Sequence, residues 1–129
     1  MSKVNIAVVG AGYWGKNIVR NIVSNSKTVL SAICDSDLDR AEKFKNEYCN
    51  TADVYSDFSK VLERNDIDAV SIVTPVYTHF ELAYQALVAE KHVLIEKPMA
   101  MSAAEAKILV DFAKEKSLNV MCDHTFCYS

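Results

Sequence analysis

The chain has 129 residues, of which 50% are hydrophobic and 24% are charged, an ordinary balance for one soluble globular domain with a sizeable core. Its formal net charge is -3 and no run of lysine or arginine occurs, which excludes electrostatic attraction to nucleic acid or to an anionic membrane. The N-terminus carries no signal-peptide pattern and no apolar stretch is long enough to span a bilayer, so we expect a cytoplasmic protein.

Short apolar segments and segments of helical periodicity alternate along the chain. The apolar segments predict strands over residues 3–9, 28–34, 51–54, 69–73, 92–95 and 118–122. Helical spacing of apolar residues predicts helices over residues 12–25, 37–49, 56–64, 78–90 and 103–116. We expect Asp35 or Ser36 to cap the second helix and Ser56 the third, while Ser102 and Glu105 form a capping-box pattern before the last.

This alternation indicates a parallel sheet covered by helices on both faces. Six strands suit a doubly wound α/β (Rossmann) fold with strand order 3-2-1-4-5-6. Ligands bind such sheets at the carboxyl ends of the strands where the order reverses, so the loops after Val9, Val73 and Ile95 should share one crevice. We expect a single dinucleotide-binding domain over residues 1–123. Residues 124–129 would then begin a substrate domain that is missing from this chain.

The four cysteines are scattered, and no two form a CxxC pair. A disulfide framework or a structural zinc site requires closer spacing. We therefore expect no metal site and interpret the cysteines as reduced, mostly structural thiols: Cys34, Cys49, Cys122 and Cys127.

A G-x-G-x-x-G motif follows the first predicted strand and opens the first predicted helix, with Tyr13 and Trp14 between its last two glycines. Gly10 permits the tight turn, Gly12 lets a pyrophosphate approach the backbone, and Gly15 allows close packing of helix on strand. The N–H groups and the dipole at the helix start then meet the phosphate charge. The alternative is a glycine turn without a ligand.

Asp35 ends the second predicted strand, about 25 residues after Gly10 and so close to the expected spacing. A carboxylate there can accept hydrogen bonds from the adenosine ribose and would repel a 2′-phosphate, which favours NAD over NADP. Asp37 is a second candidate, and Arg40 is able to pair with a phosphate. The alternative role for Asp35 is a simple helix cap.

The loop after the fourth strand begins with Thr74 and Pro75, and these residues are expected to form a wall facing the glycine loop. His79, near the start of the next helix, is either a contact to cofactor or substrate or an ordinary helix-start histidine. Glu96, Lys97 and Pro98 follow the fifth strand. A partly desolvated lysine beside a nicotinamide ring has a lowered pKa and can take a proton from a substrate hydroxyl; the alternative for Lys97 is a solvated charge.

Together these residues resemble the glucose-fructose oxidoreductase/inositol dehydrogenase family, called Gfo/Idh/MocA, over nearly the whole chain. The resemblance rests on residues 10–15, on Asp35, on Thr74-Pro75 with His79, and above all on residues 91–98. It implies that the cofactor is NAD, that Lys97 is catalytic near the nicotinamide, and that Glu96 lies in the cofactor site. It also implies a further domain that binds the substrate and forms a homo-oligomer.

Residues 12–17, Arg20-Asn21 and 124–126 are similar to the nucleotide-sugar branch of that family. This similarity implies oxidation at C3 of UDP-linked N-acetylglucosaminuronic acid or a related sugar, for surface-polysaccharide synthesis.

Three functions are open at this point. The first is an NAD-dependent dehydrogenase of a sugar or nucleotide sugar, with Lys97 as proton acceptor. The second is a non-catalytic NAD-binding regulatory or redox-sensing module. The third is another reaction on the same fold, such as biliverdin reduction or glycoside cleavage by transient oxidation. The presence of Lys97 favours an enzyme, since a sensor needs no base there.

Overall fold

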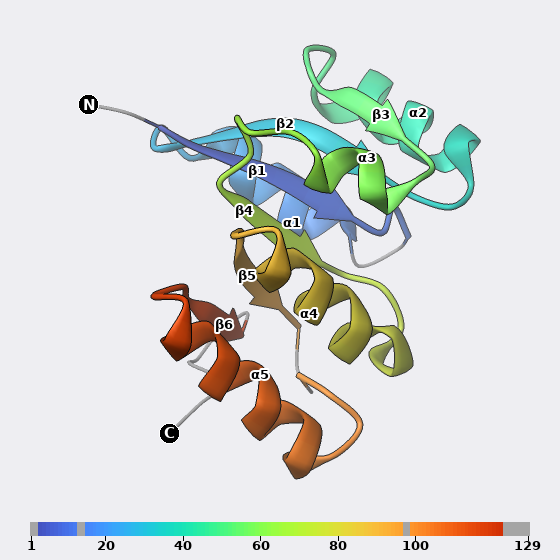
Figure 1. Ribbon diagram of the computed structural model, residues 1–129. Coiled ribbons are helices and arrows are strands. Elements are labelled where there is room, and N and C mark those ends of the chain that lie inside the picture. The colour runs from blue at the N-terminus through green and yellow to red at the C-terminus, as the bar shows by residue number, and fades with distance from the viewer. Residues whose placement is uncertain (1–2, 13–14, 97–98, 123–129) are drawn as a thin grey trace.

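The computed structural model describes residues 3–12, 15–96 and 99–122, which form one six-stranded sheet with helices on both faces (Figure 1). All strand pairs are parallel, and the order is β3-β2-β1-β4-β5-β6. This confirms the predicted doubly wound order. The strands are β1 (Val4–Val9), β2 (Thr28–Cys34), β3 (Asp53–Tyr55), β4 (Ala69–Ile72), β5 (His92–Ile95) and β6 (Val120–Cys122). The helices are α1 (Gly15–Ser24), α2 (Leu38–Tyr48), α3 (Phe58–Leu62), the 3-10 turn η1 (Val76–Thr78), α4 (His79–Val88) and α5 (Ala103–Glu115).

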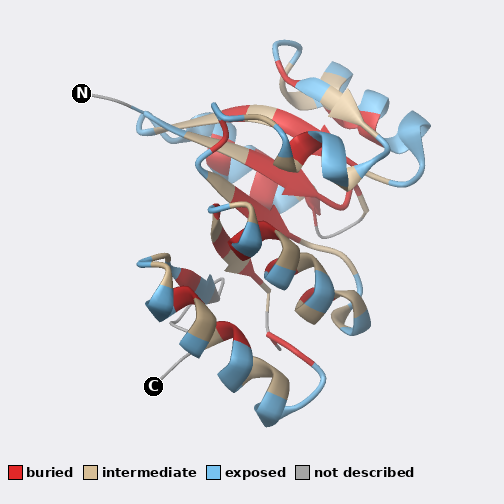
Figure 2. Ribbon diagram, viewed as in Figure 1, coloured by how far each residue is buried: buried red, intermediate tan, exposed pale blue. Residues whose placement is uncertain are grey.

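Alternate residues of the central strands face two separate cores. Val8 and Ile33 pack against α1 and α2, whereas their neighbours Val9 and Cys34 pack with α3, α4 and α5. The inner strands are therefore apolar on both faces, as expected for a parallel sheet between two helix layers, and Figure 2 shows them as mostly buried. No helix in the described part of the chain is long and apolar enough to cross a membrane.

Two helix caps differ from the prediction by one or two residues. Asp37 caps α2 by accepting from the Asp39 N–H, and Asp57 caps α3 by accepting from the Ser59 N–H. Ser36 and Ser56 do not take these roles, because a carboxylate at the next position meets the positive helix end more strongly than a hydroxyl does. Asp35 does not cap α2, because its two carboxylate oxygens already accept from the Ala11 and Asp37 N–H groups. Ser102 caps α5 as predicted, since the Glu105 N–H donates to Ser102 Oγ at 3.2 Å, while the Glu105 carboxylate accepts from the Met101 N–H rather than from that of Ser102.

Two helices end in left-handed residues that are not glycine. Glu90 after α4 has φ 67°, and Ser117 after α5 has φ 58°. The N–H groups of the residues that follow them, Lys91 and Leu118, return to the carbonyls of Ala86 and Ala113. This is the Schellman pattern that glycine usually closes, and a side chain in it carries a conformational cost. The chain has three glycines, and all of them lie within residues 10–15, where β1 leads into α1.

We predict that Ser117→Gly raises the free energy of unfolding by about 0.5–1 kcal/mol, because glycine adopts this conformation without strain. Ala104→Gly, in the first turn of the same helix, should lower it by a similar amount. Urea denaturation of the two variants measures both changes. A destabilising Ser117→Gly would contradict the assigned end of α5.

Candidate functional site

The turn after β1 requires glycine at two positions, because a side chain there would clash with the backbone. Gly10 has φ 108°, and a Cβ there would lie 2.9 Å from the carbonyl oxygen of Val73. A Cβ on Gly15 would lie 2.6 Å from the Gly10 carbonyl oxygen. These two glycines are therefore required for the turn itself. A Cβ on Gly12, in contrast, would meet no protein atom within 4 Å, so this position faces open space that a ligand can fill.

The N-terminus of α1 follows this turn at Gly15 and has no acidic residue in its first turn. The positive end of the helix dipole is thus uncompensated by a neighbouring carboxylate of the same helix, which suits an anionic ligand. Tyr13 and Trp14 lie outside the described residues.

Asp35 joins the end of β2 to the glycine loop. One carboxylate oxygen accepts from the Ala11 N–H at 2.7 Å, and the other accepts from the Asp37 N–H at 2.8 Å. The half-buried carboxylate is therefore fixed beside the loop rather than used to cap α2. Each oxygen has further lone-pair capacity toward a ligand hydroxyl.

A cavity of about 680 Å³, within the range of cofactor sites, lies at the carboxyl ends of the strands where the order reverses. It joins Gly10 and Gly12 to Asp35 and to Thr74 and Pro75, while no described residue of the loop after Ile95 lines it. The residues that line it are Val9, Gly10, Gly12, Cys34, Asp35, Ser36, Arg40, Ser56, Phe58, Val73, Thr74, Pro75, Tyr77, Thr78 and Leu82.

The loop after β4 is stiffened by hydrogen bonds among its own residues. The Thr74 and Thr78 hydroxyl oxygens are 2.6 Å apart, and the Thr78 hydroxyl donates to the Pro75 carbonyl at 2.6 Å. His79 is 2% exposed, and its Nε2 lies 2.8 Å from the Thr74 carbonyl oxygen. A carbonyl only accepts, so Nε2 carries the proton. His79 is not among the residues lining the cavity, and its ring supports the loop from behind.

The loop after β5 begins at the same edge of the sheet. Ile95 is paired with Ile72 at the end of β4, and Glu96 follows, half-buried. Glu96 does not line the cavity described above. Lys97 and Pro98 lie outside the described residues, so the structure does not place the candidate base. Met99 and Ala100, the next described residues, are buried.

Cys34 lies beneath the cavity as a buried thiol. Burial, together with the nearby Asp35 and Asp57 carboxylates, raises its pKa to about 11. The thiol therefore stays protonated at neutral pH and is a poor nucleophile, as expected of a structural cysteine. The described residues contain no group of three His, Cys, Asp or Glu side chains arranged to hold a metal ion.

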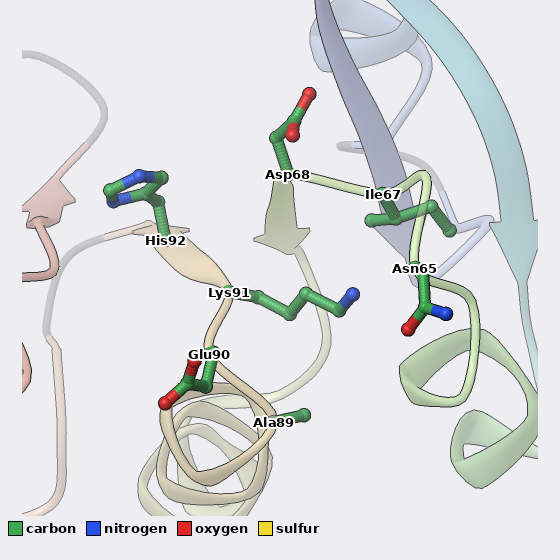
Figure 3. Close-up of a pocket in the computed structure, with 7 residues that line it drawn as sticks. All are labelled: Asn65, Ile67, Asp68, Ala89, Glu90, Lys91 and His92. Atoms are coloured by element: carbon green, nitrogen blue, oxygen red, sulfur yellow. The ribbon is translucent and has the colours of Figure 1, made fainter.

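A second cavity, of about 420 Å³, lies at the opposite edge of the sheet, where β4 and β5 begin (Figure 3). Its seven lining residues are Asn65, Ile67, Asp68, Ala89, Glu90, Lys91 and His92. The Lys91 side chain extends across it toward the loop that carries Asn65.

Lys91 is 5% exposed, and its ammonium donates to the Arg64 carbonyl at 2.5 Å. Desolvation lowers the Lys91 pKa. Arg64 in turn forms ion pairs with Asp53 and Asp66. These interactions connect the start of β5 to the segment after α3 and to β3. We interpret them as a structural network that is distant from the glycine loop.

Sequence reasoning did not identify several residues that line the main cavity. Arg40 entered only as a possible partner of a phosphate, while Ser36, Phe58, Tyr77 and Leu82 were not assigned to the site. The available clue for Ser36, Phe58 and Tyr77 was position, because each follows the carboxyl end of β2, β3 or β4 within a few residues. Leu82 lies inside α4 and had no such clue. Lys91 was also missed, since a buried lysine has no distinguishing sequence pattern.

Comparison with known proteins gives a family match over residues 4–124, to the Gfo/Idh/MocA oxidoreductase family, NAD-binding Rossmann fold. A glycosyl hydrolase family 109 protein of Shewanella sp. strain ANA-3 is 36% identical over 99% of this chain and 30% of its own length. A dTDP-3,4-didehydro-2,6-dideoxy-alpha-D-glucose 3-reductase of Saccharopolyspora spinosa is 31% identical over 97% of this chain and 37% of its own.

Among solved structures, a 3-ketoreductase of Actinomadura kijaniata, in complex with TDP-benzene and NADP, has a TM-score of 0.90. It is 28% identical, and the match covers 95% of this chain and 38% of the other. The chain thus spans about a third of the length of these relatives. They are family 109 and ketoreductase proteins and give no specific support to a UDP-N-acetylglucosaminuronate 3-dehydrogenase. The family match over most of the chain, together with the agreement in fold, shows that this chain belongs to the Gfo/Idh/MocA oxidoreductase family as its NAD-binding Rossmann-fold domain.

Proposed function

We propose that this chain is the cofactor-binding part of an NAD-dependent oxidoreductase that transfers a hydride between nicotinamide and a hydroxyl-bearing carbon of a sugar or nucleotide sugar. One observation carries the proposal: the open space beside Gly12, the fixed carboxylate of Asp35 and the wall formed by Thr74 and Pro75 belong to a single cavity. Since relatives are about three times longer, the full activity belongs to the longer protein.

The residues of the cavity fit a dinucleotide. The cradle at Gly12 and the start of α1 would hold the pyrophosphate, because Gly12 borders open space and the positive end of α1 has no competing carboxylate in its first turn. Asp35 would accept hydrogen bonds from the adenosine ribose. Thr74 and Pro75 would close the opposite wall. When bound, NAD supplies the hydride acceptor, and the chain's own residues bind and orient it.

NAD is the proposed cofactor rather than NADP because the Asp35 carboxylate would repel a phosphate on the ribose. The competing group is Arg40, which lines the same cavity and forms an ion pair with Asp37 at 3.5 Å. The Actinomadura kijaniata 3-ketoreductase was crystallised with NADP, so the preference proposed here rests on Asp35 of this chain and not on that relative.

Lys97 is the proposed proton acceptor. This role rests on the sequence resemblance. The described residue that precedes Lys97 in the sequence is Glu96, at the carboxyl end of β5. A lysine there would take the proton from the substrate hydroxyl as hydride leaves the same carbon. In the reverse direction it would return that proton to a ketone oxygen.

The proposed substrate is a sugar, with nucleotide-sugar chemistry at C3 as the finer proposal. The names of the Saccharopolyspora spinosa and Actinomadura kijaniata relatives both specify reduction at position 3. From the sequence resemblance we extend this to UDP-linked N-acetylglucosaminuronic acid or a related sugar in polysaccharide synthesis, with a homo-oligomeric, cytoplasmic longer protein.

A second candidate is glycoside cleavage by transient oxidation. It is favoured by the glycosyl hydrolase family 109 relatives, at 36% identity in the example above. Such a reaction uses the same cofactor half, so the two candidates differ only in the substrate part of the longer protein. Release of free sugar without net consumption of NAD would identify it.

We predict that Gly12→Ala weakens NAD binding by at least about tenfold while leaving the free domain stable, because the added Cβ meets no protein atom but fills the cradle. Gly10→Ala is the matched contrast. It should destabilise the domain by about 1–3 kcal/mol, because its Cβ meets the Val73 carbonyl at a positive φ. Calorimetric titration and urea denaturation of both variants separate binding from folding. Unchanged NAD affinity in Gly12→Ala would refute the proposed cradle.

We predict that the unaltered chain binds NAD at least about tenfold more tightly than NADP, since a 2′-phosphate would face the Asp35 carboxylate. Asp35→Asn removes the charge at similar size, so the ratio of the two dissociation constants should shift toward NADP. Arg40→Ala should instead raise the dissociation constant for NADP. Tighter NADP binding by the unaltered chain would reverse the assignment.

We predict that Lys97→Ala in the full-length protein lowers kcat by about 10²–10⁴-fold, because the substrate hydroxyl loses its proton acceptor. The dissociation constant for NAD should change less than about threefold. Steady-state kinetics and a separate NAD titration give the two values. Turnover that survives the substitution would contradict the assigned base, and a protein with NAD binding but no turnover on any sugar before substitution would support the sensor module.

A further inference from the structure

The main cavity corresponds to one half of a dinucleotide site. Its lining comes from the loops after β1, β2, β3 and β4, and no described residue of the loop after β5 contributes. Asp35, the proposed ribose ligand, lies within this lining. Beyond Gly12 and Asp35 the lining includes Ser36, Phe58 and Leu82, which follow β2, β3 and β4 in the chain. Because Asp35 is the proposed ribose ligand, these residues would belong to the adenosine side of the crevice, an inference that rests on the proposed function.

Tyr77 is the most exposed large apolar side chain of the described residues, at 72%, and it lines this side of the cavity. Its backbone is held in place on both sides. The Thr78 N–H and hydroxyl both donate to the Pro75 carbonyl, and the buried His79 ring contacts the Thr74 carbonyl. A large ring is thus presented to solvent from a stiff turn, so little backbone ordering is needed when a flat ligand contacts it.

The same cavity carries a cation. Arg40 lines it from α2, and its guanidinium lies 3.5 Å from the Asp37 carboxylate with the side chain 58% exposed. Phe58 and Leu82 add apolar residues to the same lining. A cavity lined by a phenol ring, a guanidinium and apolar side chains suits a flat heteroaromatic ring.

We propose that Tyr77 is the stacking platform for the adenine ring of the dinucleotide, with Arg40 in the lining of the same cavity. The hydroxyl of Tyr77 is not required for this role, because stacking uses the ring face. The assignment explains why an exposed aromatic residue occupies a turn fixed by four threonine, proline and histidine contacts.

Binding of NAD and of ADP-ribose, which lacks the nicotinamide ring, tests this assignment in the chain as it stands. Tyr77→Ala should weaken both ligands by the same factor, roughly tenfold. Tyr77→Phe should stay within about twofold of the unaltered chain. Val88→Ala, an exposed apolar residue at the far end of α4, is the control and should bind both ligands unchanged.

Each outcome decides the matter. Equal affinity of Tyr77→Ala and the unaltered chain overturns the stacking role while the proposed function stands. Weaker NAD binding with unchanged ADP-ribose binding places the ring against the nicotinamide end and also overturns it. If the unaltered chain binds neither ligand, the proposed function fails, and the stacking role of Tyr77 fails with it. Nuclear Overhauser contacts between the Tyr77 ring and the adenine protons would support the proposal directly.

Discussion

The fold of this domain depends on the close approach of Gly10 to the carbonyl of Val73. β1 and β4 are neighbours in the sheet, and their chains leave toward opposite faces, to α1 and α4. The two turns must therefore pass each other, and there is no room for a Cβ between them. The Val73 N–H donates to the Val9 carbonyl at 2.9 Å and fixes the crossing. The cavity opens where the two chains diverge beyond this contact, so its position follows from the order of the strands.

The architecture could be predicted because its causes are local and repeated. Apolar strands of four to seven residues such as β1, β2 and β5 stand out against amphipathic helices, and right-handed crossovers then leave few strand orders. The helix caps were misplaced because several polar residues compete at each helix start. Asp37 prevails over Asp35 because the Asp35 carboxylate is already used by the Ala11 N–H, a contact between segments far apart in sequence.

The candidate site was predictable in part for the same reason. Gly10, Gly12, Asp35 and Thr74 were found because the motif and the strand ends fix them. The role of His79 was open, since only the folded loop shows its ring turned to the Thr74 carbonyl. Tyr77 and Arg40 also line the cavity, but neither belongs to a motif that marks a cofactor-binding residue. The opposite edge of the sheet, with Lys91 and Arg64, holds a polar network of structural character.

The double use of the Asp35 carboxylate constrains how such a domain can change its cofactor. Any residue that makes room for a phosphate there, such as serine or glycine, also deprives the Ala11 amide of its acceptor. An unsatisfied backbone donor beside the phosphate cradle is costly. A switch in specificity by one substitution should therefore loosen the very loop that the new cofactor needs. Evolution or engineering toward NADP would have to supply a replacement acceptor, from water or a neighbouring side chain, in the same step.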